Sequence, residues 1–173
     1  NYSNIAEAKY KDALTLAKKM HNSIEKFMND TNESNFIDVK NSWLKARTIY
    51  QQTEVFRFGN PLVDDWEGKV NAWPLDEGLI DYVDNTNYYP SENDFSNFNV
   101  IANKKFKVEG ELIDASVINP KLLSNELHEI GGNEANVATG YHAIEFLLWG
   151  QDLNGNESGS GNRPYTDFDL EAC

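Results

Sequence analysis

The sequence is poor in cysteine and has no long apolar run. Its single cysteine, Cys173, is the last residue, and one thiol forms no disulfide within the chain, so cysteine alone leaves the redox compartment open. No stretch of about 18 apolar residues is present, which excludes a membrane-spanning helix. The first residues, Asn-Tyr-Ser-Asn-Ile, lack the basic and apolar regions of a signal peptide. These first residues therefore do not distinguish an exported protein whose signal peptide was removed from a cytosolic protein.

Basic residues are also scarce. The 173 residues include 15 Lys and Arg against 28 Asp and Glu, which gives a formal net charge of −13. This balance argues against nucleic acid and against anionic membrane surfaces, because both need a basic face on the protein. Residues 1–50 hold 8 basic and 6 acidic residues, whereas residues 51–173 hold 7 basic and 22 acidic ones. The acidic part of the chain predicts either a well-solvated surface or one that attracts cations.

Apolar residues recur at helical spacing in several segments, which predicts helices there. Residues 3–29 and 33–57 are expected to form two long amphipathic helices. The other expected elements are a turn-rich link over 59–73, a short helix over 74–82, loops with short helical pieces over 85–118, helices over 119–129 and 134–149, and a glycine-rich loop over 151–163. Asn133 is the expected N-cap of the helix over 134–149.

One stripe of the helix predicted over 33–57 combines Trp43 and Tyr50 with three charged residues, Arg47, Glu54 and Arg57. Charged residues seldom share a buried stripe unless they are paired. The stripe therefore has two interpretations. It is either the wall of a polar cavity, with Glu54 as a ligand, or an exposed i, i+3 ion pair between Glu54 and Arg57.

The most informative segment is Gly140-Tyr-His-Ala-Ile-Glu145. His142 and Glu145 are three residues apart and share one helix face. Such a pair ligates Zn²⁺, iron or copper, or acts as a base with its orienting partner, or forms a hydrogen-bonded pair inside a core. A glycine within a helix is less favourable than alanine by about 1 kcal/mol. The presence of Gly140 therefore indicates that backbone or a ligand approaches closely at this position. His128 is interpreted as an ordinary residue on a helix surface.

Other chemical motifs are absent. The sequence has no His-Glu-x-x-His, no Gly-x-Ser-x-Gly and no P-loop. The segment Asp152–Glu157 begins like an EF-hand but lacks its glycine and its closing glutamate, so it is interpreted as a loop.

The segment from Asn136 to Asp152 closely resembles the signature of the imelysin family, Gly-x-His-x-x-Glu. Further blocks resemble imelysins in the family's order: Ser42–Arg47, Glu54–Gly59, Asn71–Glu77 and Asn162–Phe168. The resemblance implies an all-α domain built from two related helical-bundle halves. It also implies a bacterial exported protein, periplasmic or held as a surface lipoprotein by an anchor upstream of residue 1.

The resemblance implies a site as well. Gly140, His142 and Glu145 correspond to the family's proposed functional site at the junction of the halves, and the blocks around Glu54, Arg57 and Asp76 add further candidates. The expected ligand is a metal ion (iron, zinc or copper) or haem, bound in iron uptake. The alternatives are a metallopeptidase that uses the same pair and a non-catalytic helical domain that binds a protein partner.

Imelysin domains are about twice as long as this chain. The resemblance therefore predicts that residues 1–173 form the N-terminal half of such a domain and that the C-terminal half is its partner. Imelysins often carry a cysteine pair after the Pro-Tyr-Thr-Asp stretch. Cys173 lies where the first of these cysteines is expected, which implies a disulfide with a residue beyond the chain and an oxidising compartment.

Overall fold

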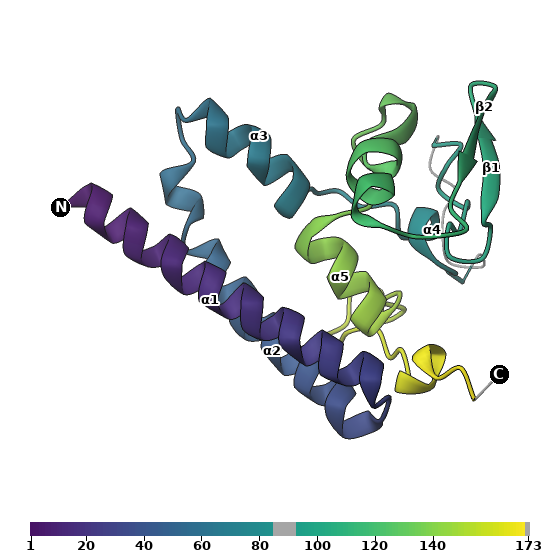
Figure 1. The fold of residues 1–173 in the computed structure, drawn as a ribbon, viewed down its shortest axis with the longest axis horizontal. Helices are drawn as coiled ribbons and strands as arrows, with labels where there is room; N and C mark the ends of the chain where they lie inside the picture. The colour runs from purple at the N-terminus through teal and green to yellow at the C-terminus, as the bar shows by residue number, and fades with distance from the viewer. Residues whose placement is uncertain (85–92, 172–173) are drawn as a thin grey trace. The chain divides into compact units, whose positions relative to one another are not determined.

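A computed structural model describes residues 1–84 and 93–171, and the expectations for Cys173 and for residues 85–92 lie outside this part of the chain. The chain is mostly helical (Figure 1), which confirms the predicted fold class. The regular elements are α1 (Tyr2–Asn29), α2 (Glu33–Gln51), α3 (Pro61–Val70), α4 (Glu77–Ile80), β1 (Lys105–Val108), β2 (Glu111–Asp114) and α5 (Gly140–Trp149). Among the described residues, no helix combines the length and the apolar character of a membrane span.

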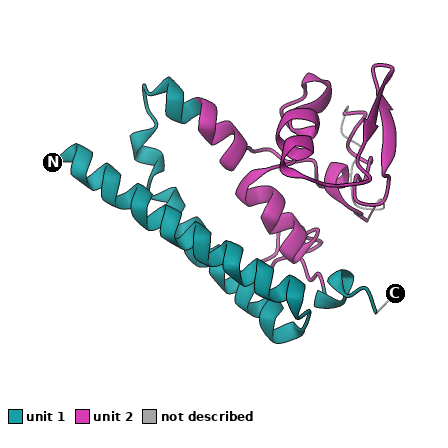
Figure 2. Ribbon diagram, in the orientation of Figure 1, with its two compact units in different colours: residues 1–64, 164–173 teal, residues 65–163 magenta. Residues whose placement is uncertain are grey.

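The chain divides into two compact units (Figure 2), and each is described by itself. The first unit comprises Asn1–Asp64 and the described residues after Arg163. The second unit comprises Asp65–Arg163 and contains the His-x-x-Glu segment. The predicted site residues are therefore distributed over both units.

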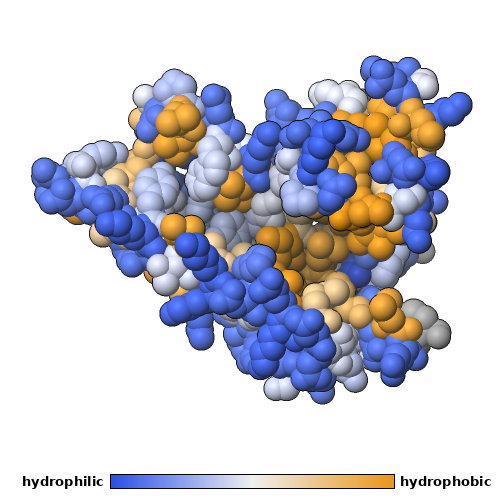
Figure 3. All heavy atoms as spheres, viewed as in Figure 1, coloured by the Kyte–Doolittle hydropathy of each residue, from blue (hydrophilic) through white to orange (hydrophobic). Residues whose placement is uncertain are grey.

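The first unit is a hairpin of α1 and α2. On α1 the buried residues Ala13, Met20 and Phe27 recur every seventh position, so they form one stripe that faces α2. The partner stripe on α2 is Phe36, Val39, Trp43, Ala46 and Tyr50. On the face shown in Figure 3, hydrophilic residues cover most of α1. The amphipathic pattern of the sequence therefore predicted this hairpin correctly.

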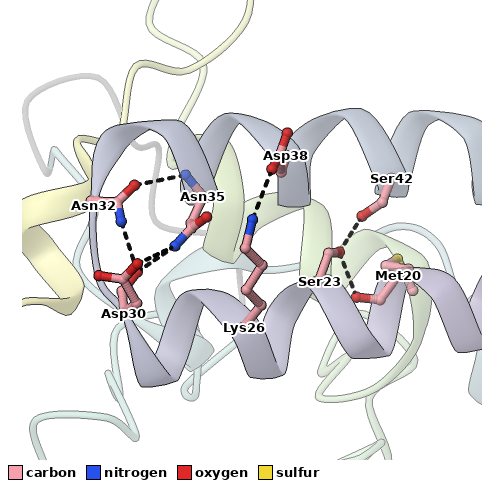
Figure 4. A network of polar contacts seen from close by, with 8 residues as sticks. All are labelled: Met20, Ser23, Lys26, Asp30, Asn32, Asn35, Asp38 and Ser42. Carbon is pink, nitrogen blue, oxygen red and sulfur yellow. Dashed lines mark hydrogen bonds and ion pairs between the residues drawn. The ribbon is translucent and has the colours of Figure 1, made fainter.

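Asparagine side chains define the tip of the hairpin (Figure 4). The Asn32 side chain accepts a hydrogen bond from the Asn35 amide at 2.9 Å and thereby caps α2. The buried Asn35 amide group donates to the Asp30 carbonyl at 2.8 Å. Further along, the hydroxyls of Ser23 and Ser42 lie 2.6 Å apart and join the two helices. These polar contacts fix the helix register because a shift by one residue would leave buried groups unsatisfied.

The C-terminal part of the chain packs on this tip. A 3₁₀ turn, η4 (Tyr165–Phe168), carries the Phe168 ring to within 5.5 Å of the Phe27 ring and 5.6 Å of the Phe36 ring. Both distances lie in the range of favourable aromatic pairs. The segment that resembles imelysins at 162–168 thus completes the core of the first unit.

The second helix is shorter than predicted, because α2 ends at Gln51 and a 3₁₀ turn, η1 (Glu54–Phe56), follows. The Thr53 amide and hydroxyl both donate to the Tyr50 carbonyl, at 2.8 and 2.7 Å. These i, i+3 bonds tighten the last turn and end the helix. Glu54 and Arg57 therefore do not continue the α2 stripe. The Arg57 Nε atom lies 3.3 Å from Asp64 Oδ1 instead.

The predicted link over 59–73 is wrong, because it contains α3. Proline suits the first position of a helix, where no donor is needed, and Pro61 opens α3 in this way. Asp64 in the first turn and Lys69 in the last turn favour the helix through its dipole. Proline is common both in turns and at the first position of a helix, and Pro61 occupies the helical position.

The prediction of loops and helical pieces over 85–118 is also wrong where β1 and β2 form an antiparallel hairpin. Glu109 and Gly110 have φ values of 50° and 90°, the conformation of a two-residue hairpin turn. The half-buried side of the hairpin, with Phe106 and Ile113, packs on a core cluster. The buried members of that cluster are Leu79, Val100, Ala115, Leu122, Leu127 and Ile130.

The two helices predicted over 119–149 differ from the structure. A π-helical segment, η2 (Leu122–Leu127), replaces most of the first, and a 3₁₀ turn, η3 (Ile130–Gly132), follows. The second helix starts at Gly140 rather than at 134. The Asn133 side chain accepts from the Ala135 amide at 2.9 Å, and the fully buried Asn136 donates to the Ile130 carbonyl at 2.5 Å. These bonds hold residues 133–139 in an irregular conformation.

Candidate functional site

The His-x-x-Glu pair lies on α5, as predicted. His142 Nδ1 lies 3.2 Å from Glu145 Oε2, one turn along the helix. The His142 side chain is 17 % exposed and that of Glu145 is 44 % exposed, so the pair is accessible and is not locked inside a core. With Nδ1 donating to the carboxylate, the lone pair of the ring lies on Nε2. This is the form in which an oriented histidine ligates a metal.

Trp73 covers one side of the imidazole. Its ring centroid lies 4.9 Å from that of His142, with the planes inclined by 52°. The indole is 71 % exposed, which is unusual for a tryptophan. It follows α3 by three residues and belongs to the block Asn71–Glu77 that resembles imelysins. The sequence analysis did not include Trp73 among the site residues.

Glu77 is the carboxylate that the structure adds to the pair. Burial, and then the negative charges of Asp152 and Glu145, raise the pKa of Glu77 from 4.5 to about 7, while Arg163 lowers it. Three carboxyl groups therefore share one electrostatic environment. Carboxylates that lie close together repel each other when all of them are ionised. Either a bound proton or a bound cation relieves this repulsion. The residue predicted from the sequence is the neighbouring Asp76, because nothing in the local sequence distinguishes the two carboxylates.

The raised pKa of Glu77 predicts a pH-dependent stability. The folded protein binds this proton more tightly than the unfolded chain, so the stabilisation is complete below pH 4.5 and is lost as the pH rises through about 7. Because Glu77 is partly exposed, we expect a loss of about 1–2 kcal/mol between pH 5 and pH 8. Glu77→Gln should remove most of that dependence, as measured by urea denaturation across this range. Glu111→Gln on exposed β2 is the control and should keep the wild-type slope.

Asp76 forms hydrogen bonds that link two segments of the second unit. Its carboxylate accepts a hydrogen bond from Asn93, and its backbone amide donates to the Ala135 carbonyl at 2.8 Å. The same Asn93 amide group donates to the buried Asn136 side chain at 2.7 Å. Asp76 thus joins the start of α4 to the segment before α5.

The remaining predicted residues are Glu54, Arg57 and Gly140. Glu54 and Arg57 belong to the first unit, so the site described within the second unit does not include them. Gly140 is the first residue of α5, with φ +88°, and a Cβ atom there would lie 2.5 Å from the Val70 carbonyl oxygen. The close approach predicted at Gly140 is confirmed, and its partner is the backbone carbonyl of Val70.

His128 was interpreted as a surface residue, and this is wrong. Its side chain is only 4 % exposed, Nε2 lies 3.0 Å from the Gly68 carbonyl, and Nδ1 lies 3.3 Å from Thr139 Oγ1. No local pattern indicates this burial, because the partners are 60 and 11 residues away along the chain.

The side chains do not form a complete metal site. Among residues 1–84 and 93–171, no group of three His, Cys, Asp or Glu side chains is placed to hold a metal ion. The donor types nevertheless fit, since imidazole and carboxylate together suit zinc, iron and copper. His142 and Glu145 are thus a partial ligand set beside two further carboxylates.

The fold and this site define a mostly helical domain with an accessible His-x-x-Glu pair on one helix. The family model that matches the sequence is Imelysin, over residues 6–173. The chain therefore belongs to the imelysin family. A search of curated proteins finds no match to it.

Proposed function

We propose that this domain binds a metal ion through His142 and Glu145, as part of an exported bacterial protein of iron uptake. The observation that carries the proposal is the accessible His142–Glu145 pair, 3.2 Å apart, beside Glu77, whose pKa is raised by burial and by the charges of Asp152 and Glu145. Such an environment favours a cation. Haem, whose iron is also ligated by histidine, is the second ligand to test.

The chemistry of the pair supports this assignment. A carboxylate that accepts from one ring nitrogen orients the imidazole and increases its basicity. Asp152 and Glu145 lie close enough to Glu77 for their charges to raise its pKa, so Glu77 and Asp152 are further oxygen donors for the pair. A bound metal would supply a compensating positive charge and Lewis acidity.

The partial ligand set implies a contribution from elsewhere. We propose that the C-terminal half of the imelysin domain supplies the remaining ligands, since the resemblance places the family site at the junction of two halves. The experiments below therefore use the full-length protein.

Substitution of the pair should abolish specific binding. We expect His142→Ala to weaken the affinity for the bound metal at least about 10- to 100-fold, because a ligand and its orienting contact are both lost. Isothermal titration with iron, zinc, copper and haem, and metal analysis of the purified protein, measure the effect. His21→Ala is the matched control, because His21 also lies near a glutamate, Glu25, but on the exposed surface of α1. Equal binding by wild type and His142→Ala would refute the proposal.

A metallopeptidase is the second candidate, and one observation favours it. A carboxyl group with a pKa of about 7, such as Glu77, matches the requirement for a general base at neutral pH. The same protein preparations can be tested on a peptide panel. Chelator-sensitive cleavage that Glu77→Gln abolishes while metal binding persists would support the enzyme. If the metal-loaded protein cleaves none of the peptides, the metallopeptidase proposal fails and metal binding remains the proposed function.

A further inference from the structure

The C-terminal end of α3 is capped by side chains from distant parts of the chain. Gly68 and Lys69 lie in its last turn, where carbonyl groups have no hydrogen-bond partner within the helix. His128 Nε2 approaches the Gly68 carbonyl at 3.0 Å, and Thr139 Oγ1 donates to the Lys69 carbonyl at 2.8 Å. The two capping residues follow α3 by about 60–70 positions, so this cap exists only in the folded second unit.

The cap indicates which atoms carry protons. The Gly68 and Lys69 carbonyls can only accept, so His128 Nε2 and the Thr139 hydroxyl must both donate to them. The single hydrogen of Thr139 is then used for the Lys69 carbonyl, and the Thr139 oxygen also lies 3.3 Å from His128 Nδ1. His128 and Thr139 therefore contact each other as well as the end of α3.

The same cap determines where the motif helix begins. Thr139 is the N-cap residue of α5, and Gly140 packs directly on the Val70 carbonyl. The end of α3 and the start of α5 are thereby held together. Trp73 follows α3 by three residues and His142 is the third residue of α5, so this junction also sets the contact between the two rings.

We propose that His128 and Thr139 are positioning residues for the candidate site. As a cap on α3 they hold the first turn of α5 in place, and they keep His142 against Trp73. The inference depends on the proposed function only in treating His142 as the ligand-binding residue. The cap itself can be tested without any ligand.

The test compares Thr139→Val, Thr139→Ser and His128→Gln in the full-length protein. Valine keeps the shape of threonine without its hydroxyl, whereas serine keeps the hydroxyl. We expect Thr139→Val and His128→Gln to speed hydrogen exchange of the first-turn amides of α5 about five- to tenfold, and Thr139→Ser to preserve protection. NMR signals of the His142 ring and the Trp73 indole should shift in the first two variants only. The ¹⁵N spectrum of wild-type His128 should show a proton on Nε2, the nitrogen that meets the Gly68 carbonyl.

The control is His21→Gln on exposed α1, which should leave all these signals unchanged. The proposal is overturned if Thr139→Val and His128→Gln lower global stability without a selective change in α5 and in the His142–Trp73 contact. It is also overturned if Thr139→Ser behaves like Thr139→Val, or if the ¹⁵N spectrum shows no proton on His128 Nε2. Absence of metal binding by the wild type, together with selective loosening of α5 in the variants, would refute the proposed function and leave the cap established.

Discussion

Replacement of Arg163 by methionine is expected to destabilise the second unit by about 3–5 kcal/mol, because it leaves the Asp81 carboxylate buried without its cation. Arg163 Nη1 lies 2.6 Å from Asp81 Oδ2, and the two side chains are 3 % and 10 % exposed. The guanidinium also stacks over the rings of Tyr82 and Phe146, at 4.9 and 5.5 Å. Methionine retains most of the length of arginine, so the loss of stability reflects the missing charge more than the missing side-chain volume.

Native-state hydrogen exchange of the α5 amides would measure this loss within the unit concerned. The matched control is Lys105→Met, which breaks the exposed ion pair with Asp114 on the β-hairpin and should cost less than about 1 kcal/mol. The double variant with Asp81→Asn should recover part of the stability, since the unpaired charge is then gone. Similar small effects for Arg163→Met and Lys105→Met would contradict the prediction.

The second large effect is expected at Gly140, where alanine should cost about 3 kcal/mol or more. Two terms add: a positive φ disfavours a residue with a side chain by about 1–2 kcal/mol, and forcing an atom into a close contact costs about 1–3 kcal/mol. At Gly140 the φ is +88° and the added Cβ would meet the Val70 carbonyl oxygen at 2.5 Å and its carbon at 2.7 Å. The backbone of α3 would have to move to accommodate it.

Gly132→Ala separates these two terms. Gly132 has a φ of +71°, but a Cβ there would meet nothing within 4 Å, so only the conformational term of about 1–2 kcal/mol applies. Urea denaturation of the two variants should therefore differ by at least about 1 kcal/mol. Under the proposed function, titration of Gly140→Ala with iron, zinc or copper should also show weaker binding than the wild type, because the start of α5 is displaced. Equal stability of the two variants would show that the close approach to Val70 is unimportant.

Both predictions concern how the motif helix is held. Gly140 fixes its start against α3. Beyond its end, the Arg163 amide donates to the Trp149 carbonyl at 2.9 Å, and the Arg163 side chain pairs with Asp81 after α4. The His142–Glu145 pair therefore lies on a short helix that is anchored at both ends, as a precise ligand site requires.

Features that depend on local sequence were predictable. Apolar side chains at helical spacing predicted α1 and most of α2. The spacing of His142 and Glu145 placed both on one face of a helix. The groups concerned are within a few turns of one another, so 3.6 residues per turn was enough to place them. Gly140 indicated a close approach, but its partner Val70 is distant along the chain and was not indicated.

Features that depend on distant contacts were not predictable. The helix over 134–149 was expected six residues too long because the Asn136 side chain draws its own segment out of helical geometry through buried bonds to Ile130 and Asn93. Likewise, Glu77 and Asp76 are adjacent carboxylates in the sequence, and only burial and charged neighbours in the folded unit distinguish Glu77.

The sequence by itself determined that the chain is mostly helical, that it belongs with the imelysins and that it carries a His-x-x-Glu pair on a helix. Only the tertiary structure decided which carboxylate joins that pair and that His128 is buried against the end of α3. The physical reason is the same for both: burial and electrostatic neighbours come from segments some 60–80 residues apart, and no periodicity along the chain records them.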